Sequence, residues 1–275
     1  MIKIEKVPEK NRIILHIFKM KIYFKDNLRY YLLSPFVQIL KLFSNFYFFV
    51  RRLNIKKNYK IISLGTYCFS RVITTANKLK PRRCKGEKTC PFDLAAFSDF
   101  NSVINLIDTN FLNFYNDLDK DEQKCWCNKN IGVIFPHDNE LSKEQFIERY
   151  NKRIENLYGY FKDENTHKFI LISSSSFIEI YQIEELICVL KKYMNKEDFD
   201  IILINQSDKF NKYKGENVYV INQDKNVEEF NYIAERDWVS AIFKLTEIEA
   251  LKIYIEVTNS LINIISNVMN KKCSC

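Results

Sequence analysis

Glycine, proline and histidine are scarce in this chain of 275 residues, which holds five glycines, five prolines and three histidines. The glycines stand apart from one another, so the sequence carries neither a P-loop nor the glycine-rich fingerprint of dinucleotide-binding proteins. Few glycines and prolines also argue against an all-β fold with many tight turns. The net charge is +8, but the lysines are spread along the chain and interleaved with acids, and no nucleic-acid-binding motif occurs. We therefore expect no nucleic-acid partner.

Disulfides and metal ligands need consideration because the chain holds eight cysteines. The first ten residues, MIKIEKVPEK, lack the apolar core and cleavage site of a signal peptide, so we expect a cytoplasmic protein with reduced thiols. Two pairs of cysteines flank polar loops: Cys84 with Cys90, and Cys125 with Cys127. Five residues and one residue separate the members of these pairs, whereas about two to four separate paired zinc ligands. We therefore expect neither a bound metal nor another cofactor.

Residues 1–59 form a basic, aromatic segment that we predict to be helical. Its stretch over 30–50 is nearly uncharged but contains Lys41, and a central lysine costs about 2.5–3.5 kcal/mol on membrane insertion. We therefore expect no transmembrane helix here. Two interpretations stay open: residues 29–57 contact an anionic membrane surface as an amphipathic helix, or this helix packs on the protein's own core.

Residues 60–270 alternate short apolar runs with helical patterns of about a dozen residues. This order predicts crossover units, and hence an α/β domain with a mainly parallel central sheet and helices on both faces. Uninterrupted apolar runs, such as FILI and IILI, favour strands that are covered on both faces. A polar tail over 271–275 follows the domain. We predict strands over 60–65, 168–173, 199–205 and 217–222, and helices over 68–79, 100–115, 142–161, 180–194 and 237–270.

A cysteine stands at the first predicted junction between a strand and a helix, in KIISLGTYCFSRV. Sites in parallel α/β sheets form beyond the carboxyl ends of strands, and a thiol at a helix N-terminus has a lowered pKa. We predict that Gly65 permits a sharp turn, that Thr66 caps the helix, and that first-turn N–H groups such as that of Phe69 bind an oxyanion. The alternative is that Cys68 is an inert, buried, small residue, as most cysteines are.

A nucleophilic thiol needs a base, and only three histidines are available. His16 lies in the basic N-terminal segment, and His167 lies in a polar loop where we expect it to be solvated. His137 follows the apolar run IGVIF, so it would emerge near Cys68 if that run were parallel to the first strand. Asp138 is its neighbour, and because adjacent extended residues point in opposite directions, we expect Asp138 to fix the loop or cap the next helix.

Asp93 is a third candidate because it follows an apolar pair, in CPFDLAAF. A carboxylate in apolar surroundings is costly without a partner. Three roles stay open for Asp93: it orients the histidine, fixes its loop through backbone N–H groups, or caps the following helix.

Three motifs, ISLGTYC, PFD and FPHD, occur in this order between residues 62 and 138, within a resemblance that runs over about residues 60–240. Together they resemble a bacterial family described as papain-like cysteine peptidases, a domain of unknown function with SLGxxC, PFDW and FxHD motifs. Leu94 replaces the tryptophan of the second motif. The resemblance implies that Cys68 is the nucleophile and His137 the base, and we add Asp93 as a third member. The matching residues are Ser63, Leu64, Gly65, Cys68, Pro91, Phe92, Asp93, Phe135, His137 and Asp138.

The sequence thus predicts a cysteine-dependent hydrolase or acyltransferase that acts on a peptide- or acyl-bearing substrate through a Cys–His pair. We expect Cys68 to react with iodoacetamide before Cys188, which should be buried in its helix. One alternative is a non-catalytic, membrane-associated binding module, linked to surface-glycan assembly. Another is a structural domain in which the motifs only fix loops.

Overall fold

The computed structural model describes residues 2–7, 12–17, 20–25, 46–53, 55, 58–80, 86–173, 178–205, 210, 213, 215–222 and 245–272. Cys84, the tail beyond residue 272 and most of the stretch over 29–57 lie outside the described residues.

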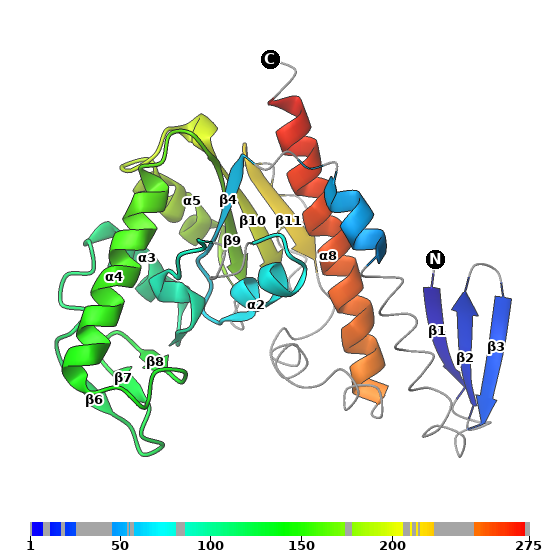
Figure 1. The fold of residues 1–275 in the computed structure, drawn as a ribbon, viewed down its shortest axis with the longest axis horizontal. Helices are drawn as coiled ribbons and strands as arrows, with labels where there is room; N and C mark the ends of the chain where they lie inside the picture. The colour runs from blue at the N-terminus through cyan, green and yellow to red at the C-terminus, as the bar shows by residue number, and fades with distance from the viewer. Residues whose placement is uncertain are drawn as a thin grey trace.

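A parallel sheet of four strands forms the centre of the domain, in the order β11-β10-β9-β4 (Figure 1). Every neighbouring pair is parallel, as the alternation of apolar runs and helical patterns predicts. All seven residues of β9 are buried, in agreement with its unbroken apolar sequence. The α/β class is therefore confirmed. The strands are β4 (Tyr59–Ser63), β9 (His167–Ser173), β10 (Phe199–Asn205) and β11 (Val218–Asn222).

Alternate residues of the sheet face two separate hydrophobic clusters. Ile170 and Ile172 of β9 point to one cluster, together with buried residues of α3, α4 and α5. Phe169 and Leu171 point to the other cluster, with buried residues of α2, α8 and the helix over 46–53. The helices are α2 (Phe69–Ala76), α3 (Phe100–Asp108), α4 (Lys143–Phe161), α5 (Ile180–Leu190) and α8 (Leu245–Lys271), with 3-10 turns at η4 (Pro91–Asp93) and η5 (Lys196–Asp198).

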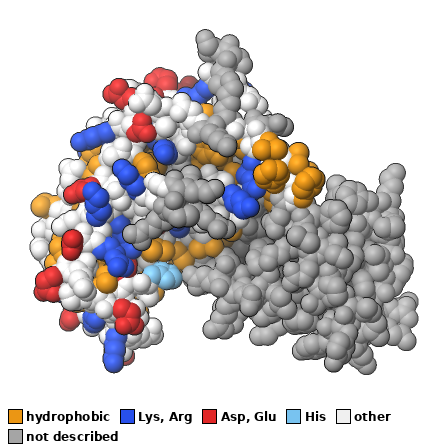
Figure 2. All heavy atoms as spheres, in the orientation of Figure 1, with side chains coloured by type: hydrophobic (Ala, Val, Ile, Leu, Met, Phe, Trp, Pro, Cys, Tyr) orange, Lys and Arg blue, Asp and Glu red, His pale blue; other side chains and the backbone are white. Residues whose placement is uncertain are grey.

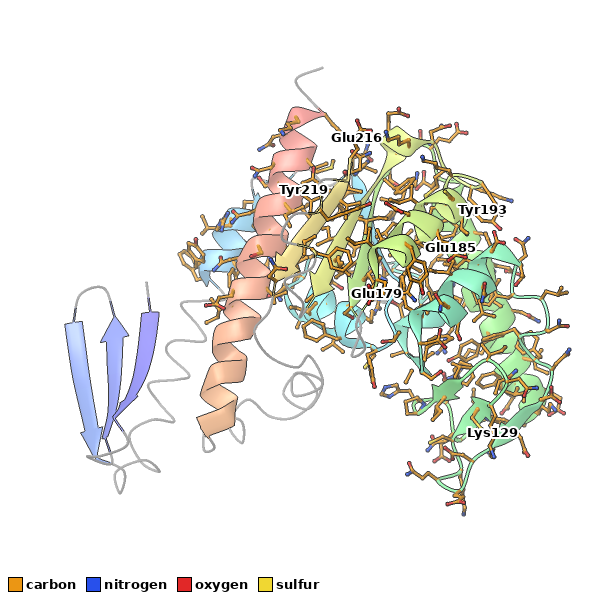
Figure 3. The ribbon with its side chains drawn as sticks, turned by 180° about the vertical axis from the view of Figure 1, so that it is seen from behind. Lys129, Glu179, Glu185, Tyr193, Glu216 and Tyr219 are labelled. Carbon is orange, nitrogen blue, oxygen red and sulfur yellow. The ribbon has the colours of Figure 1, made fainter. Side chains whose placement is uncertain are left out.

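Helix α8 crosses the outer part of the sheet beside β11, near Tyr219, in the view from behind (Figure 3). The helix over 46–53 packs beside it: Arg51 donates to Asn259 of α8 at 3.4 Å, and the buried Phe48 belongs to the same cluster as Val257. Part of the aromatic segment thus packs on the domain. Among the helices of the described ranges, none has the length and apolarity needed to cross a bilayer.

A second, antiparallel sheet of four short strands follows the order β5-β8-β7-β6. The prediction of a mainly parallel domain misses it, and the apolar run before His137 belongs to it as β8 rather than to the parallel sheet. Its strands span two or three residues each, which is too short for a period of two to stand out in the sequence. They are β5 (Ala96–Phe97), β6 (Leu118–Lys120), β7 (Trp126–Asn128) and β8 (Val133–Phe135).

The segment before residue 59 is not wholly helical as predicted. It contains an antiparallel sheet of three strands, β1 (Ile2–Val7), β2 (Arg12–Ile17) and β3 (Met20–Lys25). Apolar and charged residues alternate over the first four residues of IKIEKV, and MKIYFK is rich in β-branched and aromatic residues, both of which are typical of strands. The helix over 46–53 follows them along the chain.

Candidate active site

Cys68 stands at the N-cap of α2, five residues beyond the end of β4. Its backbone is already helical, with φ −67° and ψ −3°, and its carbonyl accepts a hydrogen bond of 3.0 Å from the N–H of Val72. The thiol is half-buried and not part of a disulfide. The helix therefore begins where the sequence predicts, and the sulfur lies at the positive end of the helix dipole.

Gly65 and Thr66 both lie against Ser173 of β9. A Cβ on Gly65 would lie 2.2 Å from the carbonyl oxygen of Ser173 in β9, so close packing requires a glycine where the chain bends after β4. Thr66 is buried, and its N–H donates to the same carbonyl at 2.9 Å. Cys68 is the N-cap residue of α2 and its side chain makes no capping hydrogen bond, so the capping role of Thr66 stays a prediction. Phe69, the first residue of α2, buries its ring in the core, and its N–H belongs to the first turn.

His137 lies in the turn that follows β8, and its side chain is exposed. The antiparallel sheet connects this turn to the loop of Cys68. The N–H of Phe97 in β5 donates to the carbonyl of Thr66 at 2.9 Å, and Ala96 pairs with Ile134 in β8. A continuous set of backbone contacts therefore joins the loop that carries Cys68 to the strand that precedes His137.

Asp93 lies at the end of η4, is fully buried and belongs to a cluster of four charged side chains. Its carboxylate is 3.2 Å from Lys80 Nζ and 3.9 Å from Arg71 Nη1, and it accepts the N–H of Cys90 at 2.7 Å. Glu87 completes the cluster, 3.2 Å from Lys80 and 3.4 Å from Arg71. Of the three roles considered for Asp93, these contacts correspond to fixing its loop through a backbone N–H. They also tie that loop to α2, which carries Arg71.

The thiol of Cys90 lies against this cluster and has a raised pKa. Burial is the main cause, and the negative charge of Asp93 adds to it. Cys90 is fully buried, so its thiol is both shielded and kept protonated at neutral pH. It is therefore a good internal reference for an unreactive cysteine.

Asp138 holds α4 in place through side chains of that helix. Its carboxylate accepts hydrogen bonds from Arg149 at 2.7 Å, Arg153 at 2.7 Å and Tyr150 at 3.0 Å. Burial alone would raise the pKa of Asp138, but the bonds and charge of Arg153 and the bonds of the other two side chains lower it. The predicted role as a helix cap is wrong, because Ser142 is the N-cap of α4.

A capping box stands at the start of α4, where the sequence predicts that the helix begins. The Ser142 hydroxyl accepts the N–H of Gln145 at 3.3 Å, and the Gln145 side chain accepts the N–H of Ser142 at 3.0 Å. Two N–H groups at the helix start are thereby satisfied.

Two other predictions are wrong. His167 is not solvated: it is the first residue of β9, it is buried, and its Nε2 lies 2.6 Å from Asp200. It therefore lies at the amino ends of the strands, opposite the end where Cys68 follows β4. Cys188 is exposed rather than buried, because α5 turns Ile183, Leu186 and Leu190 toward the core.

Within the described part of the chain, no group of three or more histidine, cysteine, aspartate or glutamate side chains is arranged to hold a metal ion. Comparison with known proteins gives no match: no family model fits the chain, and no curated protein or solved structure is significantly similar to it. The resemblance carried by the three motifs therefore remains a prediction.

Proposed function

We propose that this chain is a cysteine-dependent hydrolase or acyltransferase, with Cys68 as the nucleophile and His137 as the general base. The observation that carries the proposal is the position of Cys68 between the carboxyl end of β4 and the first turn of α2. A thiol there is favoured as a thiolate, and it lies beside N–H groups that can bind a developing oxyanion. Its partial exposure gives a substrate access to the sulfur.

The chemistry follows from these groups. His137 takes the thiol proton, and the sulfur of Cys68 attacks the carbonyl carbon of an ester or amide. First-turn N–H groups of α2, such as that of Phe69, stabilise the oxyanion. The intermediate collapses to a thioester as the leaving alcohol or amine takes the proton from His137. Water or a second nucleophile then attacks the thioester, which releases the acyl group and restores the thiol.

Asp93 has a supporting role in this proposal. Its carboxylate already binds Lys80 and the N–H of Cys90, so it contributes by fixing α2 rather than by orienting His137. The exposed position of His137 leaves its ring accessible to a substrate at the surface. The three motifs shared with papain-like cysteine peptidases support the same assignment of nucleophile and base.

The test is the formation of a thioester on Cys68 from an activated ester such as p-nitrophenyl acetate. We expect peptide mass mapping to find the acetyl group on Cys68, with release of about one p-nitrophenolate per chain in an initial burst. Cys125 is the matched control because it is also a half-buried thiol. The proposal predicts no adduct in Cys68→Ala and slow acylation in His137→Ala. Equal acylation of Cys68 and Cys125 would contradict it.

A second candidate function, membrane association without catalysis, is favoured by the helix over 46–53. Its outer face exposes five large apolar side chains, which Figure 2 shows as a group of hydrophobic atoms. Phe46 is 66% exposed and Leu53 is 64% exposed, so they differ from the buried Phe48 of the same helix. Aromatic side chains beside arginines suit the interface of an anionic bilayer. The exposed residues are Phe46, Tyr47, Phe49, Val50 and Leu53.

Flotation with vesicles that contain phosphatidylserine tests this candidate. We expect the wild-type chain to float with these vesicles, and the variant Phe46→Glu/Leu53→Glu to remain in the lower fraction. Tyr181→Glu is the control, because Tyr181 is 58% exposed on α5. If the wild type does not float, or if both variants float equally, membrane association through this face is excluded.

A further inference from the structure

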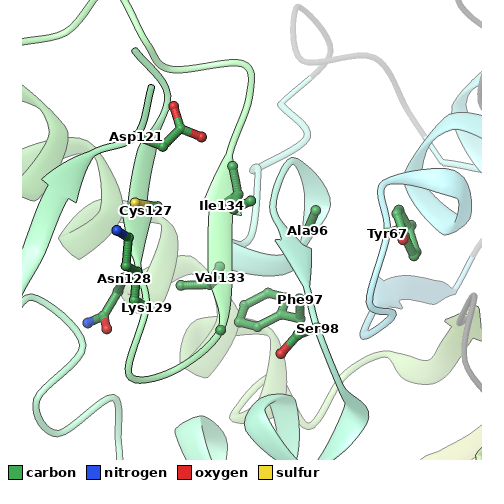
Figure 4. A pocket seen from close by; sticks show the side chains of 11 residues that line it. Tyr67, Ala96, Phe97, Ser98, Asp121, Cys127, Asn128, Lys129, Val133 and Ile134 are labelled. Carbon is green, nitrogen blue, oxygen red and sulfur yellow. The ribbon is translucent and has the colours of Figure 1, made fainter. Parts of the chain in front are cut away.

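A half-open pocket of about 380 Å³ lies beside the loop of Cys68. Tyr67, which directly precedes Cys68, lines one side of it. Figure 4 shows Tyr67 on one side, Ala96 and Ile134 in the middle, and Asp121 on the other side. The volume is within the range of pockets that bind small organic groups, which is about 300–1,000 Å³.

The floor of this pocket is apolar and belongs to the outer face of the antiparallel sheet. Ala96 is paired with Ile134, and Ile134 is paired with Cys127, so these three side chains form one row on one face. The neighbouring row contains Phe97 and Val133, which are buried in the core. Ile134 is 43% exposed, whereas the other face of β8 packs on the core. The sheet therefore presents a large apolar side chain to the pocket.

Two polar side chains that line the pocket, Asp121 and Asn128, already hold their own loops, and the exposed Lys129 lines it as well. The Asp121 carboxylate accepts the N–H groups of Gln123 at 2.9 Å and Cys125 at 2.8 Å. The Asn128 amide donates to the carbonyl of Phe114 at 3.2 Å and accepts from backbone N–H groups through its oxygen. These side chains hold their own loops, so the pocket offers mainly apolar contact to a ligand.

The pocket is connected to the proposed nucleophile by backbone. Phe97, which lines the pocket, donates its N–H to the carbonyl of Thr66, and Thr66 precedes Tyr67 and Cys68. Because Tyr67 directly precedes Cys68 and lines the pocket, a group bound at the sulfur of Cys68 lies one residue along the chain from the pocket that Ile134 and Ala96 also line. An acyl group held there would be positioned by apolar burial, which is non-directional and tolerates different shapes.

We propose that this pocket binds the apolar part of the acyl group that Cys68 attacks, so that the substrate is an ester or amide of an acid with a hydrophobic chain or side chain. The proposal rests on the function proposed for Cys68. It identifies Ile134 as a residue that determines specificity.

The test compares alkylation by iodoacetamide and by N-hexyl iodoacetamide, with rates at each cysteine measured by peptide mass mapping. Each buried methylene increases affinity by a factor of about four. The half-open pocket buries only part of the hexyl group, so we expect about a tenfold preference for the hexyl reagent at Cys68 relative to Cys125. We expect Ile134→Asp to abolish this preference. Leu112→Asp is the matched control, because Leu112 is 66% exposed and does not line the pocket.

The outcomes separate this proposal from the proposed function. If the hexyl preference at Cys68 equals that at Cys125, or if Ile134→Asp retains it, the pocket does not bind the acyl group. If the preference is present but p-nitrophenyl esters do not acylate Cys68, the pocket assignment stands and the hydrolase function fails. If neither reagent labels Cys68, both proposals fail. Ile134→Ser replaces Ile134→Asp if thermal melting shows that the aspartate variant is unfolded.

Discussion

Removal of the Asp93 charge should strongly destabilise the fold. Four side chains form the cluster, and two positive charges balance two negative ones. The side chains of Lys80 and Glu87 are 1% and 2% exposed, and that of Asp93 is 0% exposed. Water therefore does not solvate a charge in this cluster when its ion-pair partner is removed. In Asp93→Asn the cluster keeps Glu87 as its single anion, and one positive charge is left without compensation.

The magnitude follows from the geometry. Lys80 Nζ and Asp93 Oδ1 are 3.2 Å apart, which corresponds to an attraction of about 5 kcal/mol at an effective dielectric constant of about 20. The loss of one member of a buried ion pair costs about 3–5 kcal/mol, because the remaining charge is desolvated without a partner. We expect Asp93→Asn and Lys80→Met each to lower the free energy of unfolding by this amount.

The assay is urea unfolding of the wild type, the two single variants and the double variant Asp93→Asn/Lys80→Met. The double variant retains Arg71 with Glu87, so its charges balance again. Its loss of stability should therefore be smaller than the sum of the single losses by about 2 kcal/mol. Single losses below about 1 kcal/mol, or strictly additive losses, would refute the reasoning that this cluster is a coupled buried network.

Other substitutions test the packing and the electrostatics around the site. Gly65→Ala should lower the free energy of unfolding by about 3 kcal/mol, because the added Cβ meets the Ser173 carbonyl. Gly159→Ala should raise it by about 0.5–1 kcal/mol in the same urea assay, because the space around Gly159 in α4 is open. Ser142→Ala should lower the thermal midpoint by removing a cap worth about 1 kcal/mol, and an unchanged midpoint would exclude that role. Folding lowers the pKa of Asp138. The stability that its charge contributes is therefore fully present above the unfolded pKa of about 3.9, and it is lost as the pH falls through the folded pKa. Urea midpoints of wild type and Asp138→Asn should therefore differ at pH 7 and converge in acid; a constant difference would contradict this.

The parallel sheet and its helices were predictable because local patterns determine them. The run FILI in β9 is buried on both faces, and the serine and glutamine at the start of α4 form a reciprocal cap that depends only on residues three apart. The position of Cys68 was predictable for the same reason, since a strand, a short loop and a helix follow one another directly.

Long-range partners were not predictable from local pattern. Nothing near Asp93 in the sequence indicates that Lys80 and Glu87 bind within the same cluster, because the fold brings these loops together. Gly65 fits its position because Ser173 of another strand lies against it. The residues around His167 are typical of a polar loop, but the pairing of β9 with β10 brings Asp200 beside it. The antiparallel sheet escaped notice because strands of two or three residues have no recognisable period.

The central claim is that Cys68 and His137 act as a pair, and the pH dependence of Cys68 alkylation tests it most directly. The rate of iodoacetamide labelling is measured at Cys68 by peptide mapping, in the wild type and in His137→Ala, with Cys90 as the buried reference. We predict that the wild-type rate reaches half of its maximum well below pH 8.5, the pKa of an ordinary thiol, and that His137→Ala shifts this midpoint upward by about one pH unit or more. Superimposable profiles for the two proteins would contradict the pair.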